Sequence, residues 1–101
     1  MGTTWNVRAF APAAFDLGRL RHDVTATLDL IVQQMSPWVE ASDLRRFNSL
    51  RTGEQVVLPR EFLEVLQTAL AIASETDGAF DPTLGALVDL WGFGPSAAPA
   101  A

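Results

Sequence analysis

The spacing of apolar and polar residues changes several times along the 101-residue chain. Residues 3–10 alternate, which is the period of a half-buried strand. Residues 16–35 carry apolar side chains at spacings of three and four, which predicts an amphipathic helix that begins at an Asp16 cap and stops at Pro37. The members of this apolar stripe are Leu17, Leu20, Val24, Leu28, Ile31 and Met35.

The middle of the chain predicts one strand and one further long helix. Residues 36–50 read as a loop with a short helical turn after Ser42. Residues 55–58 are apolar and follow a Thr-Gly pair, as in a short strand. Residues 60–75 form a second amphipathic helix, whose predicted buried side is made of Phe62, Val65, Leu66, Ala69, Leu70 and Ala73.

The carboxyl-terminal part predicts a third helix and fixes the expected fold class. Asp81 is the expected N-cap, Pro82 the first helical residue and Gly92 the stop. Two short strands with about three helices make an α+β arrangement, and two strands leave the sheet incomplete. We therefore expect one domain portion over residues 1–94 and a disordered tail over residues 95–101.

Composition excludes several classes of protein. A net charge of −5 argues against a nucleic-acid surface, which needs clustered positive charge. The chain has no cysteine, so disulfides and thiolate metal sites are excluded. Its single histidine, His22, lies on the polar face of the first predicted helix, where a solvated side chain is expected. No apolar run is long enough to span a membrane, and no signal peptide is visible, so the expectation for the chain as it stands is cytoplasmic.

Three segments are less easily explained as core. Residues 1–5 place exposed backbone donors beside a glycine and two threonines, which suits a phosphate or ribose, although a frayed chain end gives the same pattern. Trp38 lies in a polar loop, where its ring could stack on a ligand ring or cover the end of the preceding helix. Phe80 precedes a predicted helix start whose free N–H groups could bind an anion, although Asp81 would also serve there as an ordinary cap.

In this order and spacing, these segments resemble the ApbE family of FAD:protein FMN transferases. The family pattern contains Met-Gly-Thr-Thr, then Met-Ser-x-aromatic running into Ser-x-x-x-x-x-Asn, then Thr-Asp-Gly-Ala-Phe-Asp-Pro-Thr, and finally Leu-Trp-Gly-Phe-Gly. The matching positions here are residues 1–4, 35–38, 42–48, 76–83 and 90–94. The third motif is long, and the resemblance covers residues 1–94.

The resemblance implies roles for five residues. Met1 matches a methionine that packs on FAD. Trp38 occupies the position of an aromatic residue that stacks on the flavin ring. Ala79, Phe80 and Asp81 match a three-residue segment that holds FAD. The resemblance identifies no catalytic residue within this chain.

The resemblance also implies a reaction, in which FMN passes from FAD to a Ser or Thr hydroxyl of an acceptor flavoprotein with release of AMP. Magnesium is expected to assist, but the family's metal ligands would lie downstream of Ala101, because family members are considerably longer. The alternative is a truncated, inactive chain that at most binds FAD. Many relatives are exported lipoproteins, so the native compartment is left open.

Overall fold

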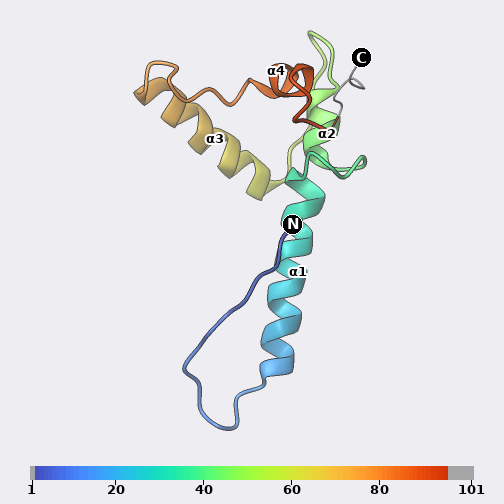
Figure 1. Ribbon diagram of the computed structural model, residues 1–101. Helices are drawn as coiled ribbons and strands as arrows, with labels where there is room; N and C mark the ends of the chain where they lie inside the picture. Colours follow the sequence, from blue (N-terminus) through green and yellow to red (C-terminus); the bar gives the residue numbers. More distant parts are fainter. Residues whose placement is uncertain (1, 96–101) are drawn as a thin grey trace.

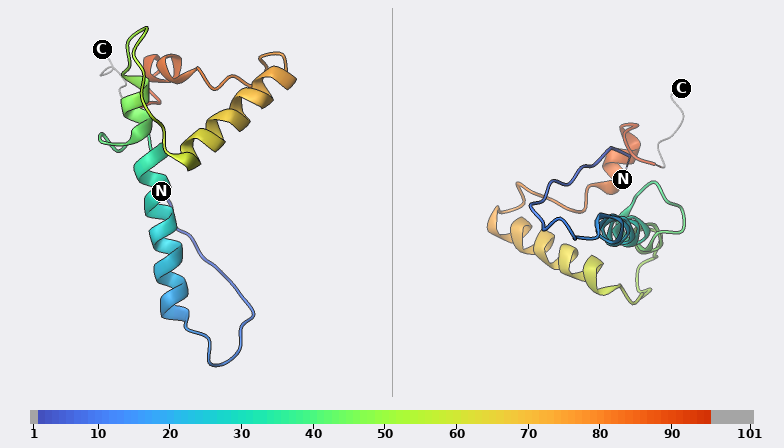
Figure 2. Two further views of the ribbon diagram at one scale, coloured as in Figure 1. Left: turned by 180° about the vertical axis from the view of Figure 1, so that it is seen from behind. Right: turned by 90° about the horizontal axis from the view of Figure 1, so that it is seen from below.

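The computed structural model describes residues 2–95, and its regular secondary structure over that range consists of helices (Figure 1). A long helix forms one arm, and a second long helix leaves its end at an angle (Figures 1 and 2). The helices are α1 (Leu17–Met35), α2 (Asp43–Asn48), α3 (Arg60–Glu75) and α4 (Gly85–Leu90). Of the two short helices, α2 lies against the end of the first arm (Figure 1).

The expected α+β class is wrong, because residues 2–95 contain no strand. Segments 3–10 and 55–58 have an apolar pattern typical of strands but follow an irregular course, and Figure 1 shows the first as an extended trace. A strand is defined by backbone hydrogen bonds to a neighbour, and neither segment has such a neighbour in the described chain. Several of their apolar side chains consequently remain exposed, including Val7 and Val57.

The two long helices are confirmed with their predicted boundaries. The Asp16 carboxylate accepts a hydrogen bond from the backbone N–H of Arg19 at 2.9 Å and caps α1. Helix α1 ends at Met35, two residues before Pro37. The short helix α2 begins after Ser42, whose hydroxyl accepts from the N–H of Arg45 at 3.2 Å. These boundaries are set by local hydrogen bonds, which is why the sequence alone places them.

The third predicted helix begins later than expected. Helix α4 starts at Gly85, and Asp81 is therefore not its N-cap, nor is Pro82 its first residue. The Asp81 side chain instead accepts from Thr83 two residues on, a turn that competes with helix formation. The predicted stop is confirmed, because Gly92 follows α4 with φ of +84°.

The core of the described chain is small. Phe62, at the start of α3, is 4% exposed and is its one buried apolar side chain. Its ring meets the ring of Phe47 in α2 edge-on, with centroids 5.8 Å apart. Most of α1 and α3 is open on at least one side. The place where α1, α2 and α3 meet is therefore the structural centre from which the other segments extend.

Candidate functional site

The loop after α1 presents Trp38 to solvent. Trp38 is 68% exposed, so its ring does not cover the end of α1 as a core residue would. Its backbone N–H donates to the Ser36 hydroxyl at 3.2 Å, and the fully buried Ser42 hydroxyl donates to the Ser36 carbonyl at 2.7 Å. The loop is therefore held by its backbone while the indole is left free. Such an arrangement offers a flat aromatic face to a ligand ring.

The second candidate segment, residues 79–81, follows α3 and is tied to its last turn. The Phe80 N–H donates to the Thr76 hydroxyl at 3.1 Å, and that hydroxyl donates to the Ile72 carbonyl at 2.8 Å. The Ala79 N–H donates to the Thr76 carbonyl at 3.1 Å. Because both amides are already engaged, neither Ala79 nor Phe80 offers a free backbone N–H to an anion. The side chains that this segment offers to a ligand are the half-exposed Phe80 ring and the Asp81 carboxylate.

The Asp81 carboxylate is held by one neighbour. Its Oδ1 accepts from the Thr83 hydroxyl at 2.6 Å and from the Thr83 N–H at 2.8 Å. These two hydrogen bonds, the hydroxyl first, keep the pKa of Asp81 below its ordinary value of 3.8. The group is therefore an anion at neutral pH. Both bonds use Oδ1, so the carboxylate can still accept through Oδ2 from a ligand hydroxyl or N–H.

The structure does not bring the two candidate segments together. The loop over residues 36–42 extends from the junction of α1 and α2, whereas residues 76–81 lie at the far end of α3, and all three views agree on this separation (Figures 1 and 2). Met1 lies outside the described residues, so its expected contact with FAD has no structural counterpart. The predicted tail falls outside them as well, apart from Pro95.

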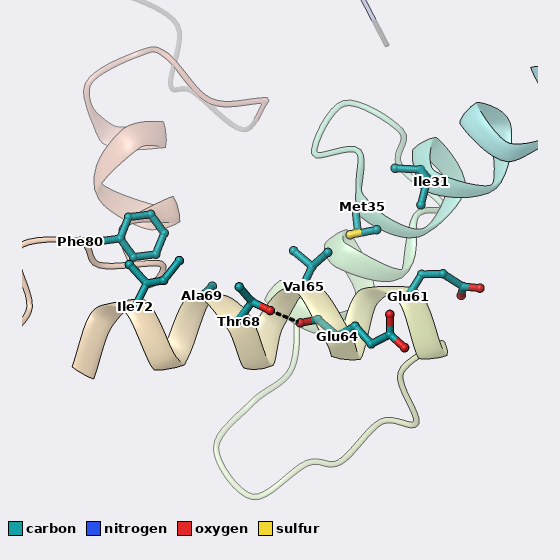
Figure 3. Close-up of a pocket in the computed structure, with 9 residues that line it drawn as sticks. All are labelled: Ile31, Met35, Glu61, Glu64, Val65, Thr68, Ala69, Ile72 and Phe80. Atoms are coloured by element: carbon teal, nitrogen blue, oxygen red, sulfur yellow. Dashed lines mark hydrogen bonds between the residues drawn. The ribbon is translucent and has the colours of Figure 1, made fainter. Parts of the chain in front are cut away.

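An apolar hollow of about 600 Å³ lies along α3 (Figure 3). Ile31 and Met35 of α1 form one end and Phe80 the other. Glu61 and Glu64 line its edge near the start of α3, and Glu64 is paired with Arg60 at 3.0 Å. The volume is in the range of small-molecule sites, but two carboxylates repel a pyrophosphate. The remaining lining residues are Val65, Thr68, Ala69 and Ile72.

A buried polar junction between α1 and α3 was not anticipated from the sequence. Gln34 is 5% exposed. Its Nε2 donates to Glu61 Oε2 at 2.9 Å, and its Oε1 accepts from the Phe62 N–H at 3.1 Å. The hydrogen bond from Gln34 is the main reason that the pKa of Glu61 lies below its ordinary value of 4.5. The available signal was the position of Gln34 between Ile31 and Met35 on the apolar side of α1.

Residues 2–95 contain neither a metal-binding cluster nor a membrane-spanning helix. No group of three or more His, Cys, Asp or Glu side chains in this range could hold a metal ion. No described helix has both the length and the apolar character needed to cross a membrane. His22 is exposed on α1, as expected for a solvated side chain.

Comparison with known proteins gives one consistent family. The ApbE family model matches residues 1–101. The chain is 37% identical over 100 residues to a FAD:protein FMN transferase of Vibrio cholerae serotype O1, a match that covers 98% of this chain and 30% of that protein. It is 34% identical over 99 residues to the FAD:protein FMN transferase of Escherichia coli K12, covering 98% of this chain and 28% of that protein.

Solved structures agree with the sequence matches. The flavin transferase ApbE from Vibrio cholerae superposes with a TM-score of 0.82 at 35% identity, over 91% of this chain and 30% of that one. The flavinyl transferase ApbE of Pseudomonas stutzeri, in its apo form, gives a TM-score of 0.76 at 34% identity, over 83% of this chain and 28% of that one. The chain thus spans less than a third of the length of these relatives.

Proposed function

Since the family model covers it from end to end, this chain belongs to the ApbE family, and we propose that it supplies part of the flavin site of a FAD:protein FMN transferase. The observation that carries the proposal is the joint match of sequence and structure, 35% identity with a TM-score of 0.82, to a flavin transferase. The reaction moves FMN from FAD to a Ser or Thr hydroxyl of an acceptor protein and releases AMP.

Trp38 has the chemistry for the ring system of the flavin. The isoalloxazine is flat and extended, and an exposed indole provides a matching surface at small cost in conformational entropy. The hydrogen bonds that fix Ser36 and Ser42 hold the backbone beneath the indole, so little ordering is needed on binding.

Segment 79–81 has the chemistry for a polar edge of FAD. The Asp81 carboxylate accepts hydrogen bonds, so it pairs with a ribose hydroxyl or a ring N–H and not with the phosphates. The Phe80 ring adds an apolar surface beside it. Met1 completes the set on the family pattern, as a flexible apolar side chain that packs on FAD.

The magnesium expected from the family does not fit the described residues, which contain no group of carboxylates able to hold it. Residues 2–95 contribute binding and orientation of the flavin, and the acceptor protein supplies the attacking hydroxyl.

The proposal is tested by titrating FAD into the purified protein and following the quenching of flavin fluorescence. A transfer assay then uses FAD, magnesium and an acceptor carrying the target Ser or Thr, with mass spectrometry for an added FMN. We expect saturable FAD binding that the Trp38→Ala change weakens. Absence of FAD binding by the protein produced from its complete reading frame would refute the proposal.

The alternative is a chain that binds FAD and transfers nothing. The two assays separate the possibilities, since binding with a magnesium-dependent FMN adduct supports the transferase and binding without an adduct supports a flavin-binding chain only. The same assays should be run on the 101-residue chain and on the product of the complete reading frame.

A further inference from the structure

The start of α3 has no cap of its own. Its N-cap residue is Pro59, which provides no side-chain hydrogen bond. The first N–H groups of a helix lack partners within the helix, and a buried one is costly unless it is satisfied elsewhere. Here Gln34 of α1 accepts from the Phe62 N–H at 3.1 Å. A side chain from another helix therefore performs the capping of α3.

The same amide also holds the neighbouring carboxylate. Gln34 Nε2 donates to Glu61 Oε2 at 2.9 Å, so both ends of one buried side chain engage the first turn of α3. Two hydrogen bonds to adjacent residues fix the direction of α3 relative to α1 as well as the distance between the two helices. Phe62 and Phe47 pack beside them. The hollow that Figure 3 shows runs along α3 from this first turn to Ile72, and Phe80 lines its far end.

Because α3 is held at its start, a small change in its tilt displaces its far end. Sixteen helical residues rise about 24 Å, so a tilt of about 10° at the start moves the far end by about 4 Å. That end carries residues 79–81 through the hydrogen bonds of Thr76. The loop with Trp38 begins two residues after Gln34 on α1. A change in the angle between α1 and α3 would therefore change the distance between the two candidate flavin segments.

We propose that Gln34 is a positioning residue, which caps α3 from α1 and thereby sets the separation of the Trp38 loop from segment 79–81. The inference rests on the proposed flavin site for its functional consequence. Its structural part stands alone, because it concerns only the angle between α1 and α3.

The test exchanges the two partners. Gln34→Glu places a carboxylate against Glu61 and removes the Nε2 donor, while a carboxylate oxygen can still accept from Phe62. Adding Glu61→Gln restores a donor on the other side, so the double variant regains both bonds. Glu61→Gln alone keeps an acceptor for Gln34 and should resemble wild type. Gln33→Glu, on the exposed neighbour, controls for the added charge.

The first measurement is the distance between the two helices. The chain has no cysteine, so Asp29→Cys and Glu75→Cys, both at exposed positions, give a unique spin-label pair. We expect a narrow distance distribution for wild type and Gln33→Glu. A broadened or shifted distribution is expected for Gln34→Glu, with recovery in the double variant. An unchanged distribution in Gln34→Glu, or no recovery in the double variant, would overturn the inference.

The second measurement is FAD affinity, taken well below each variant's melting temperature. Loss of a hydrogen bond to a charged group lowers the competent population by about tenfold, and the apparent Kd rises by the same factor. We therefore expect the FAD affinity of Gln34→Glu to be about tenfold lower than that of wild type, and the affinity of the double variant to be close to that of wild type. Leu20→Ala, in the half of α1 remote from α3, controls for lost stability alone.

The outcomes separate the two proposals. A wild type that binds no FAD refutes the flavin site, while the spin-label distances still decide whether Gln34 orients α3. A wild type that binds FAD, with distances that change in Gln34→Glu and an affinity that does not, shows that the orientation of α3 is irrelevant to the flavin and overturns the positioning role.

Discussion

Thr83 donates twice to a single oxygen of Asp81, from its hydroxyl at 2.6 Å and from its backbone N–H at 2.8 Å. This pair closes a turn over residues 81–83, two residues before α4, in place of the helix cap that Asp-Pro would suggest. It also leaves a carboxylate of fixed orientation beside Phe80. The charge of Asp81 and the geometry of the turn can therefore be changed separately.

The Thr83 hydroxyl should control the pKa of Asp81. Thr83→Val removes the strongest of the bonds that lower it, so the pKa should rise toward the ordinary value of 3.8. Carbon NMR of the side-chain carboxyl over an acidic pH series gives the value directly. Glu61 is the internal reference, because its lowered pKa depends on Gln34. An Asp81 titration identical in both proteins would contradict the assignment.

Removal of the Asp81 charge should weaken FAD binding without changing the stability of the fold. In Asp81→Asn, the amide oxygen still accepts from Thr83, so the free energy of unfolding should change by less than about 0.5 kcal/mol. FAD binding should weaken, because the anionic acceptor is lost. Asp77→Asn is the matched control in the same loop, since Asn tolerates the positive φ of 51° found there. Melting curves and FAD titrations together decide. A large loss of stability with unchanged affinity would make Asp81 purely structural.

The ring of Trp38 should contribute to affinity with little effect on stability. Trp38→Ala should weaken FAD binding by about 1 kcal/mol or more, in line with aromatic stacking, while the exposed ring contributes little to folding. Trp38→Phe keeps a flat ring and should recover part of the loss. Phe10→Ala, at a fully exposed aromatic, controls for nonspecific quenching of flavin fluorescence. Equal affinities for wild type and Trp38→Ala would exclude stacking.

The Ser42 hydroxyl should contribute substantially to the free energy of unfolding. It caps α2 and donates to the Ser36 carbonyl, and it is completely buried. Ser42→Ala should lower the free energy of unfolding by about 1–2 kcal/mol. Ser49→Ala, at the exposed end of α2, removes one hydrogen bond to Arg46 and should cost less than about 0.5 kcal/mol. Urea unfolding of both variants tests the comparison, which fails if the two losses are equal.

Acid should weaken the junction between α1 and α3. The pKa of Glu61 is depressed in the folded protein, so its stabilising contribution is complete above the ordinary value of 4.5 and is lost as the pH falls through the lower folded value. The difference in unfolding free energy between wild type and Gln34→Ala should therefore shrink as the pH falls below the ordinary value of 4.5. Urea unfolding from about pH 6 to about pH 3 measures it. A difference that is constant over this range would remove the Gln34 hydrogen bond as the cause.

The two strand predictions failed for a reason that the alternating pattern does not contain. Residues 3–10 carry the correct period for a half-buried strand, yet Trp5 and Val7 are exposed in the described chain. Alternation specifies which side chains would share a face, whereas a strand also needs a neighbouring backbone. The chain spans less than a third of the relatives it matches. The alternating pattern therefore predicts which side chains share a face, but it does not show that a partner strand is present.

The sequence by itself determined the features that depend on nearest neighbours. The long helices, the cap at Asp16, the helical turn after Ser42 and the stop at Gly92 follow from periodicity and from bonds that span a few residues. The family motifs likewise pointed to Trp38 and residues 79–81. Tertiary structure alone decided that Gln34 caps α3 through the N–H of Phe62, 28 residues away, and that the two candidate segments lie apart. Such contacts depend on how separate helices meet in space, which no local pattern encodes.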